Sequence, residues 1–310
     1  MGTFSTAELL KVRGGDSWGD SALLCTQRDM ASFARLLLNG GTWKGEQLLS
    51  KEFTQKATSP LVYNSESGFY DCFHAHGYGY QIWHTEMGGF AVVGMGGQLT
   101  IAIPSLDTIF VCTGDNQGYA SAYNLIVDGL FDYVFRKMGE PLAPSEADEK
   151  ALDEFCASQK LISLANPVKT DFESTINGVT FFAPENKTGI TQFALKFEGE
   201  KGVFCYENAQ GYKEIPFGLG HNEFSLFPEL GYSNEFGGER TCDGFKYKCA
   251  CSGGWVEEKK LCIKVQVIDR YFGNFFATFA WKDDYCAVRL HKTAEDFFQT
   301  YDGSFVAKRK

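Results

Sequence analysis

Histidine, cysteine and acidic side chains stand close together in one short stretch of the chain, and these residue types bind transition metals. The stretch holds Asp71, Cys72, His74 and His76 and precedes a glycine-rich segment. A tetrahedral zinc site needs four ligands at characteristic spacings. The pair His74-x-His76 is common by chance in loops, and the spacing does not identify which residue would be a third ligand. We therefore expect an ordinary loop here, and we predict no metal site and no cofactor.

The ten cysteines form an even number, which permits disulfides. The densest group is Cys249-Ala250-Cys251, with Cys242 and Cys262 on either side. Side chains alternate between the two faces of a β-strand, so Cys249 and Cys251 share one face. Their spacing does not match the usual zinc pair, and no histidine stands at a matching distance. The interpretation we favour is reduced thiols packed in a core, with a metal ion or a disulfide as alternatives.

Serine followed three residues later by lysine is the S-x-x-K pattern for acyl transfer, because the lysine can then accept the serine proton. No serine or threonine of the 310-residue chain has a lysine at that distance. Tyr206-Glu207-Asn208 and Tyr232-Ser233-Asn234 match a Tyr-x-Asn pattern that assists proton transfer, and we interpret both as chance matches. Phosphate-binding and dinucleotide-binding glycine motifs are absent from the sequence.

The composition restricts the classes of partner. A net charge of −10 opposes binding to nucleic acid or to an anionic membrane, because phosphate groups would be repelled. No stretch reaches the roughly 18 consecutive apolar residues that cross a bilayer, and residues 1–6 do not begin a signal peptide. We therefore expect a cytoplasmic protein for the chain as given, or an exported one if a signal peptide is encoded upstream.

The hydrophobic pattern of the first half predicts an antiparallel sheet with flanking helices, which is an α+β fold. The predicted helices cover residues 27–40, with Thr26 as N-cap, 50–58 and 125–135. The predicted strands cover residues 77–84, 90–93, 98–103 and 108–113.

The second half predicts an all-β, lipocalin-like barrel or sandwich. A stretch rich in glycine, proline and acids, residues 139–148, indicates a boundary, and a short helix follows over 149–160. Eight short strands with turn residues between them are expected at 178–182, 192–197, 203–206, 223–226, 246–251, 261–268, 275–281 and 285–290. The predicted organisation is a first domain over 1–140, a linker with a short helix over 141–166, and the β-rich domain over 167–310.

Two segments of the first half form a recognisable pattern. One runs from Gly19 to Gly41 and contains Thr26-Gln27-Arg28-Asp29-Met30 and Leu36-Leu37-Leu38-Asn39-Gly40-Gly41; the other contains Gly77-Tyr78-Gly79-Tyr80, Gly94-Met95-Gly96-Gly97-Gln98 and Ile103-Pro104-Ser105-Leu106-Asp107. In this order, over residues 17–138, they resemble the back portion of class C β-lactamase and penicillin-binding-protein-like serine hydrolases. Residues 254–273 look like the β-rich domain appended to some bacterial members of this superfamily.

The resemblance implies where the family's third catalytic motif falls. In the family this motif places a lysine or histidine beside the substrate, and the next backbone N–H helps to bind the oxyanion. Alignment on Gln98 places Val92, Val93 and Gly94 at the motif and the N–H of Met95 at the oxyanion position. Alignment on the family's Gly-His-Gly-Gly variant instead places Met95 where histidine would be. The polar side chain is missing in both registers.

The neighbouring residues Gly96, Gly97 and Gln98 are candidate binding residues. The interpretation we favour is a close strand approach or a bulge without a catalytic role, and a retained binding cleft is the alternative. Because S-x-x-K, Tyr-x-Asn and the third-motif side chain are missing, we expect a truncated or degenerate hydrolase that is inactive alone. The resemblance also implies an uncovered sheet edge, hence self-association or a partner chain that supplies the missing hydrolase portion.

A binding module is the alternative function. A lipocalin-like barrel can enclose an apolar ligand, and a protein or peptidoglycan partner is a further possibility. The aromatic residues expected to line the barrel are Phe181, Phe182, Phe197, Phe204, Phe275, Phe276, Phe279 and Trp281. The interpretation we favour is that these rings fill the barrel. An intact enzyme with an unfamiliar nucleophile is a third hypothesis.

Overall fold

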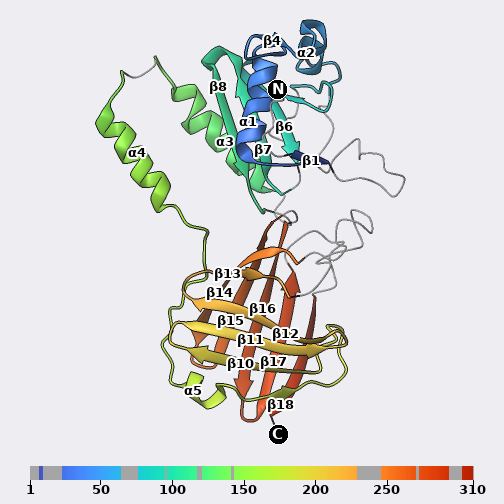
Figure 1. Ribbon diagram of the computed structural model, residues 1–310, viewed down its shortest axis with the longest axis vertical. Coiled ribbons are helices and arrows are strands. Elements are labelled where there is room, and N and C mark those ends of the chain that lie inside the picture. The colour runs from blue at the N-terminus through green and yellow to red at the C-terminus, as the bar shows by residue number, and fades with distance from the viewer. Residues whose placement is uncertain are drawn as a thin grey trace. The chain divides into compact units, whose positions relative to one another are not determined.

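The computed structural model describes residues 7–9, 23–63, 76–94, 96–116, 121–140, 143–228, 246–269, 272–292 and 302–309. The chain divides into two compact units, Met1–Leu142 (unit 1) and Ala143–Lys310 (unit 2) (Figure 1). The candidates Asp71, Cys72, His74, Met95, Cys242 and Tyr232-Ser233-Asn234 lie outside the described residues. The predicted α+β class, a sheet with helices followed by an all-β barrel, is confirmed.

Unit 1 is built on a four-stranded antiparallel sheet with the strand order β5-β6-β7-β8. The strands are β5 (Trp83–His84), β6 (Phe90–Gly94), β7 (Gln98–Ile103) and β8 (Thr108–Thr113). Two smaller two-stranded sheets pair β1 (Ala7–Leu9) with β2 (Leu23–Cys25), and β3 (Thr42–Trp43) with β4 (Glu46–Gln47). Strands β6, β7 and β8 match the predicted ranges within one residue.

The predicted strand over 77–84 was wrong except at its end. Gly77 and Gln81 have positive φ angles of 97° and 57°, which turn the chain sharply. Tyr78 consequently forms isolated bridges to Val62 and Trp83 instead of joining a continuous strand. Only β5 remains to pair with β6.

Helices cover both faces of this sheet. Helix α1 (Gln27–Leu38) begins at Thr26, which forms a capping box with Asp29, and ends before Gly40. Together with α2 (Lys51–Ala57), it buries Ala34, Leu37 and Ala57 against Phe90 and Ala102. On the opposite face, α3 (Ser121–Tyr133) and the η4 turn (Phe135–Lys137) bury apolar residues against Ala91, Leu99, Ile101 and Ile103.

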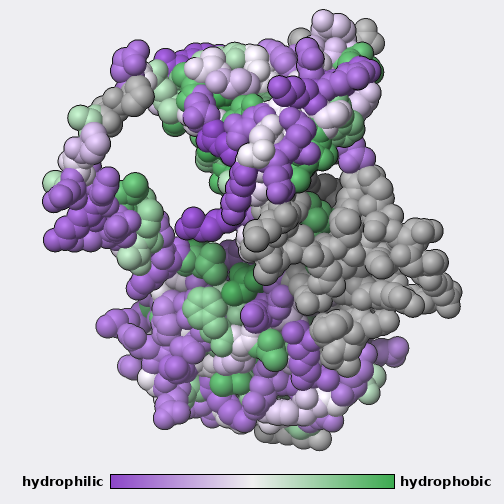
Figure 2. Space-filling view, turned by 45° about the horizontal axis from the view of Figure 1, so that its top comes forward, coloured by the Kyte–Doolittle hydropathy of each residue, from purple (hydrophilic) through white to green (hydrophobic). Residues whose placement is uncertain are grey.

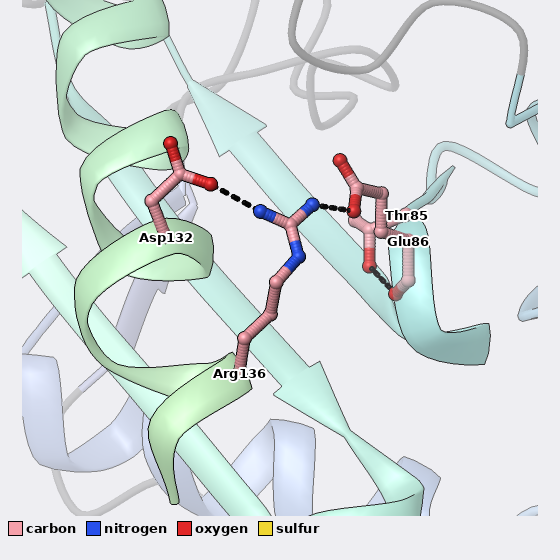
Figure 3. Close-up of polar contacts among 4 residues, drawn as sticks. All are labelled: Thr85, Glu86, Asp132 and Arg136. Atoms are coloured by element: carbon pink, nitrogen blue, oxygen red, sulfur yellow. Dashed lines mark hydrogen bonds and ion pairs between the residues drawn. The ribbon is translucent and has the colours of Figure 1, made fainter.

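Arg136 fastens the end of α3 to the loop between β5 and β6 (Figure 3). Its guanidinium forms ion pairs with Asp132 of α3 and with Glu86 of the η2 turn (Glu86–Gly88). The Thr85 hydroxyl donates to the carbonyl of Glu86 at 3.1 Å and holds that turn in place. The contacts with the two carboxylates raise the pKa of Arg136 above its ordinary value.

Unit 2 is a β-barrel preceded by helix α4 (Glu146–Ser158) and helix α5 (Phe172–Ile176). The ten-stranded sheet has the order β12-β11-β10-β9-β18-β17-β16-β15-β14-β13, and it closes where β12 pairs with β14 (Figure 1). The strands are β9 (Phe181–Phe182), β10 (Gln192–Glu198), β11 (Lys201–Asn208), β12 (Gly211–Leu219), β13 (Glu223–Leu226), β14 (Lys248–Glu257), β15 (Lys260–Ile268), β16 (Phe272–Lys282), β17 (Tyr285–Lys292) and β18 (Gly303–Arg309).

All eight predicted strands of unit 2 are present, but β12 and β18 were missed. Pro216 interrupts the pattern of β12 because it lacks an N–H for the ladder. The strand tolerates it because β12 pairs along its length only with β11 and meets β14 through just Gly218 and Leu219. Across the described residues, no helix has the length and apolar character required to span a membrane.

Candidate functional site

The segment predicted to carry the degenerate motif is the end of β6 and the turn into β7. Gly94 lies directly opposite Gln98 in the antiparallel register. Val92 packs with the cluster under α1, whereas Val93 packs with the cluster under α3. The two valines therefore point to opposite faces of the sheet, and each serves as a half-buried packing residue rather than as a proton donor or acceptor.

Backbone hydrogen bonds hold this turn closed. The N–H of Gly114 donates to the carbonyl of Gly97 at 3.0 Å, and the N–H of Asn116 donates to the carbonyl of Gly96 at 2.7 Å. The side-chain amide of Gln98 donates to the carbonyl of Gly114 at 2.7 Å. The Gly-Gly-Gln segment thus joins the β6–β7 turn to the end of β8.

Glycine is required at position 97 by both conformation and space. Its φ of +100° lies in the region that side chains rarely adopt, and a Cβ would come within 2.6 Å of the Asn116 amide. Gly96 also has a positive φ, of 80°. The described geometry gives Gly96, Gly97 and Gln98 roles in shaping the turn. Their assignment as binding residues stays a prediction.

Tyr123 completes the turn, and sequence reasoning missed it. Its hydroxyl accepts a hydrogen bond from the N–H of Gly97 at 2.8 Å and donates one to the carbonyl of Gly94 at 2.5 Å. Tyr123 is buried in the stripe that α3 presents with Val127 and Phe131. The available signal was a tyrosine at helical spacing from two buried apolar residues, because a buried phenol needs a hydrogen-bond partner.

Two titratable side chains of this sheet lie at different distances from the turn. Cys112 of β8 is one residue from Thr113, which lies opposite Gln98, and burial raises the pKa of its thiol. The other, His84, lies on β5 opposite the far end of β6. His84 pairs with Phe90, four residues from Gly94, which is about 13 Å along a strand. Burial, and then the positive charge of His76, lowers the pKa of His84 below its ordinary value. The N–H groups of Gly97, Gly114 and Asn116 therefore already donate within the turn, and the titratable group that β8 brings near it is the Cys112 thiol.

Metal binding gains no support from the part of the chain that is described. No group of three or more histidine, cysteine or acidic side chains is placed to hold an ion there. Cys249 and Cys251 share the inner face of β14, as strand alternation predicts, and both are buried. Their sulfur atoms lie 3.5 Å apart, and donation from Cys251 lowers the pKa of Cys249.

The inside of the barrel is filled by its own aromatic rings. Phe193 of β10 lies 5.4 Å from Phe279 of β16, and Phe204 of β11 lies 5.1 Å from Phe279, measured between ring centroids. Near α5, Trp255 lies 5.6 Å from Trp281. These contacts join strands that are not neighbours in the sheet, so rings meet across the barrel rather than around an open space. The expectation that aromatic residues line and fill the barrel agrees with this core for six of them: Phe181, Phe197, Phe204, Phe275, Phe279 and Trp281. It was wrong for Phe182, which is 37% exposed, and Phe276 alternates with the buried Phe275 and Ala277 and is not part of the core.

Comparisons with known proteins give partial likenesses only. No family model and no curated protein matches the chain. A solved structure described as a 6-aminohexanoate-dimer hydrolase from Bacillus anthracis is 26% identical over 40% of this chain, with a TM-score of 0.32. This chain spans 31% of that hydrolase's length.

Other similar structures are small β-barrels. A Schistosoma mansoni fatty acid binding protein in complex with arachidonic acid is 12% identical over 44% of this chain and 97% of its own, with a TM-score of 0.30. Lipid binding protein 8 of Caenorhabditis elegans is 6% identical over 46% of this chain and 100% of its own, with a TM-score of 0.31. The class that the strands themselves define is an α+β chain whose β-rich unit is a closed barrel.

Proposed function

We propose that unit 1 is the sheet portion of a β-lactamase-type serine hydrolase and is not catalytically active by itself. In this proposal the β6–β7 turn forms a backbone-lined wall of an acyl-transfer site. The nucleophile is supplied by another polypeptide segment that carries S-x-x-K. Activity, substrate and partner are all part of the proposal.

Strand β8 carries the proposal. Ile109 packs with the cluster under α1, whereas Phe110 and Cys112 pack with the cluster under α3, so β8 is apolar on both faces. Strands of this kind belong inside a sheet, and an exposed apolar edge recruits another strand. Among the described strands, β8 pairs only with β7. A strand added along β8 would place an incoming segment beside the Gly114–Asn116 backbone that holds the turn.

The rigidity of the turn supports its use as a wall. Preorganised backbone N–H groups stabilise developing negative charge, because they need no rearrangement during the reaction. The N–H groups of Gly97, Gly114 and Asn116 already donate within the turn, so in this proposal the oxyanion donor is the N–H predicted for that role, that of Met95. Tyr123, Gln98 and Gly114 fix the turn from three elements. Val92 and Val93 provide no proton-transferring group, so acid–base chemistry must come from the added segment.

Covalent labelling and light scattering test the proposal together. The full chain is treated with a fluorophosphonate and its intact mass is measured, and we expect no adduct. Light scattering of the same protein is expected to show self-association through β8 when no other partner is present. A labelled serine, or a monomer at every concentration, would contradict the proposal.

Matched variants locate the interface. Val111→Lys places a charge on β8 and is expected to shift the protein toward monomer, because edge charges oppose strand addition. Leu125→Lys removes a large hydrophobic residue of α3 that is 74% exposed, one of several at the surface (Figure 2), and is expected to leave association unchanged. Equal effects of the two variants would indicate nonspecific hydrophobic contact instead of strand pairing.

A barrel that binds an apolar ligand is the second candidate, and one observation favours it. The indole N–H of Trp281 is buried and has no hydrogen-bond partner among the residues that the structure describes. A ligand atom that accepts this hydrogen bond would remove the cost of an unsatisfied donor. Such a ligand must displace rings that now touch, so native mass spectrometry should find no co-purified lipid. A stoichiometric lipid would favour the binding module over the hydrolase proposal.

A further inference from the structure

The outer face of the barrel carries a groove of about 500 Å³ across β16, β17 and β18. Its lining includes Thr278, Ala280, Ala287, Arg289, Ser304 and Val306. The volume falls within the roughly 300–1,000 Å³ of small-molecule sites. The groove lies in unit 2 and is independent of the function proposed for unit 1.

Short side chains produce the groove. Ala280 lies directly opposite Ala287, and Ala287 lies directly opposite Val306. The side chains in the middle of this row are therefore short and leave a depression on the outer face of the sheet. Tyr285 and Lys308 form the next row, with the Lys308 ammonium 5.3 Å from the tyrosine ring. The longer side chains of Tyr285 and Lys308 therefore form a wall at one end of an apolar floor made by Ala280 and Ala287.

A polar row borders the same floor. Thr278 lies opposite Arg289, and Arg289 lies opposite Ser304, so a residue with a hydroxyl lies on each side of Arg289. Cβ atoms in directly opposed positions are about 4.5–5.5 Å apart, which lets all three groups contact one small ligand. The Thr278 hydroxyl also lies 3.7 Å from the thiol of Cys262 on β15, the strand on the side of β16 away from Arg289.

Arg289 differs from Arg309, the last residue of β18, which lies beyond the row of Tyr285 and Lys308. Arg309 is paired with Asp284 at 2.7 Å, whereas Arg289 has no ion-pair partner among the residues that are described. An unpaired guanidinium beside an apolar floor attracts a compact anion by a local, charge-assisted contact, which must exceed the general repulsion from a chain of net charge −10. The same net charge disfavours polyanions, because they extend beyond the groove.

We propose that this groove binds a small amphipathic carboxylate. The carboxylate pairs with Arg289 in a bidentate manner and takes hydrogen bonds from Thr278 and Ser304. The apolar part of the ligand lies over Ala280 and Ala287. A short aryl or alkyl chain fits this floor, whereas a ligand without a charge loses the contact with the guanidinium.

Ligand-observed NMR on the full chain tests the proposal with 4-phenylbutyrate as the probe. 4-Phenylbutan-1-ol and 4-phenylbutylamine have the same apolar part but are neutral and cationic. We expect measurable binding of the carboxylate and at least about tenfold weaker binding of the other two, as expected for loss of a charge-assisted pair. Equal binding of the alcohol, or no binding of the carboxylate at its highest soluble concentration, would overturn the proposal.

Variants place the probe in the groove. Arg289→Ala is expected to weaken carboxylate binding about tenfold, whereas Arg309→Ala, on the same sheet but outside the groove lining, leaves it unchanged. Ala287→Gln fills the floor while Arg289 remains, and binding is expected to be lost. Thermal unfolding verifies that each variant folds. Retained binding in both Arg289→Ala and Ala287→Gln would mean that the probe binds elsewhere, for example inside the barrel.

Discussion

The two largest sheets of the described structure differ in how their edge strands are paired. In unit 2, the sheet closes where β12 pairs with β14 at Gly218 and Leu219, and among the described strands edges remain along the rest of β12 and along β13. In unit 1, β8 is apolar on both faces and, among the described strands, has a neighbour on only one side. Closure removes edges, whereas an open apolar edge requires another strand.

This difference separates stability from function. The barrel depends on rings that contact one another across its interior, and its groove lies outside that core. In unit 1, by contrast, hydrogen bonds from Tyr123, Gln98 and Gly114 hold the short turn between β6 and β7. We infer that unit 2 is complete as a core, whereas the candidate site of unit 1 depends on what adds to β8.

The largest expected effect is on the barrel core. Phe279→Ala removes a fully buried ring that contacts Phe193, Phe204 and Trp281, and is expected to cost about 3–5 kcal/mol through lost burial and a cavity. Phe224→Ala is the control, because that ring is 66% exposed, and it is expected to change stability by less than about 0.5 kcal/mol. Urea unfolding of the full chain measures both. Similar costs would mean that Phe279 is not part of a close-packed core.

The next effect is on the turn of unit 1. Tyr123→Phe keeps the ring but leaves the N–H of Gly97 and the carbonyl of Gly94 without the hydroxyl, which is expected to cost about 1–3 kcal/mol. Tyr133→Phe is the matched control on the same helix, because its side chain is 73% exposed. Hydrogen exchange at the N–H of Gly97 monitors the opening of unit 1 and measures the loss of stability. Unchanged exchange would show that the hydroxyl does not hold the turn.

Local patterns predicted most strands, because alternation is a property of neighbouring residues. Strand β15 alternates strictly, with Leu261, Ile263 and Val265 buried, and its predicted range differs from the observed one by a single residue. The failures have local causes as well. Positive φ at Gln81 ended the predicted strand over 77–84, and Pro216 concealed β12.

The candidate sites depend on contacts between residues that are far apart in the sequence. The sequence pattern predicted these contacts only in part. The spacing drew attention to Gly97, but its bond to Tyr123 joins residues 26 positions apart on different elements. The groove at Arg289 required the register of three strands, because Thr278 and Ser304 flank Arg289 only across the sheet. Residue type alone does not distinguish Arg289 from the paired Arg309.

The smallest expected effect is a pH dependence confined to unit 1. Burial, and then the charge of His76, holds the pKa of His84 below its ordinary value of 6.5, so the folded protein binds that proton more weakly than the unfolded chain. The contribution to stability is therefore complete above pH 6.5 and is lost as the pH falls through 6.5 toward the lower folded pKa. His84→Gln should flatten the fall in the melting temperature of unit 1 across this range, whereas His291→Gln in the barrel should not. An equal slope in the wild type and in His84→Gln would show that another group controls the acid sensitivity of this sheet.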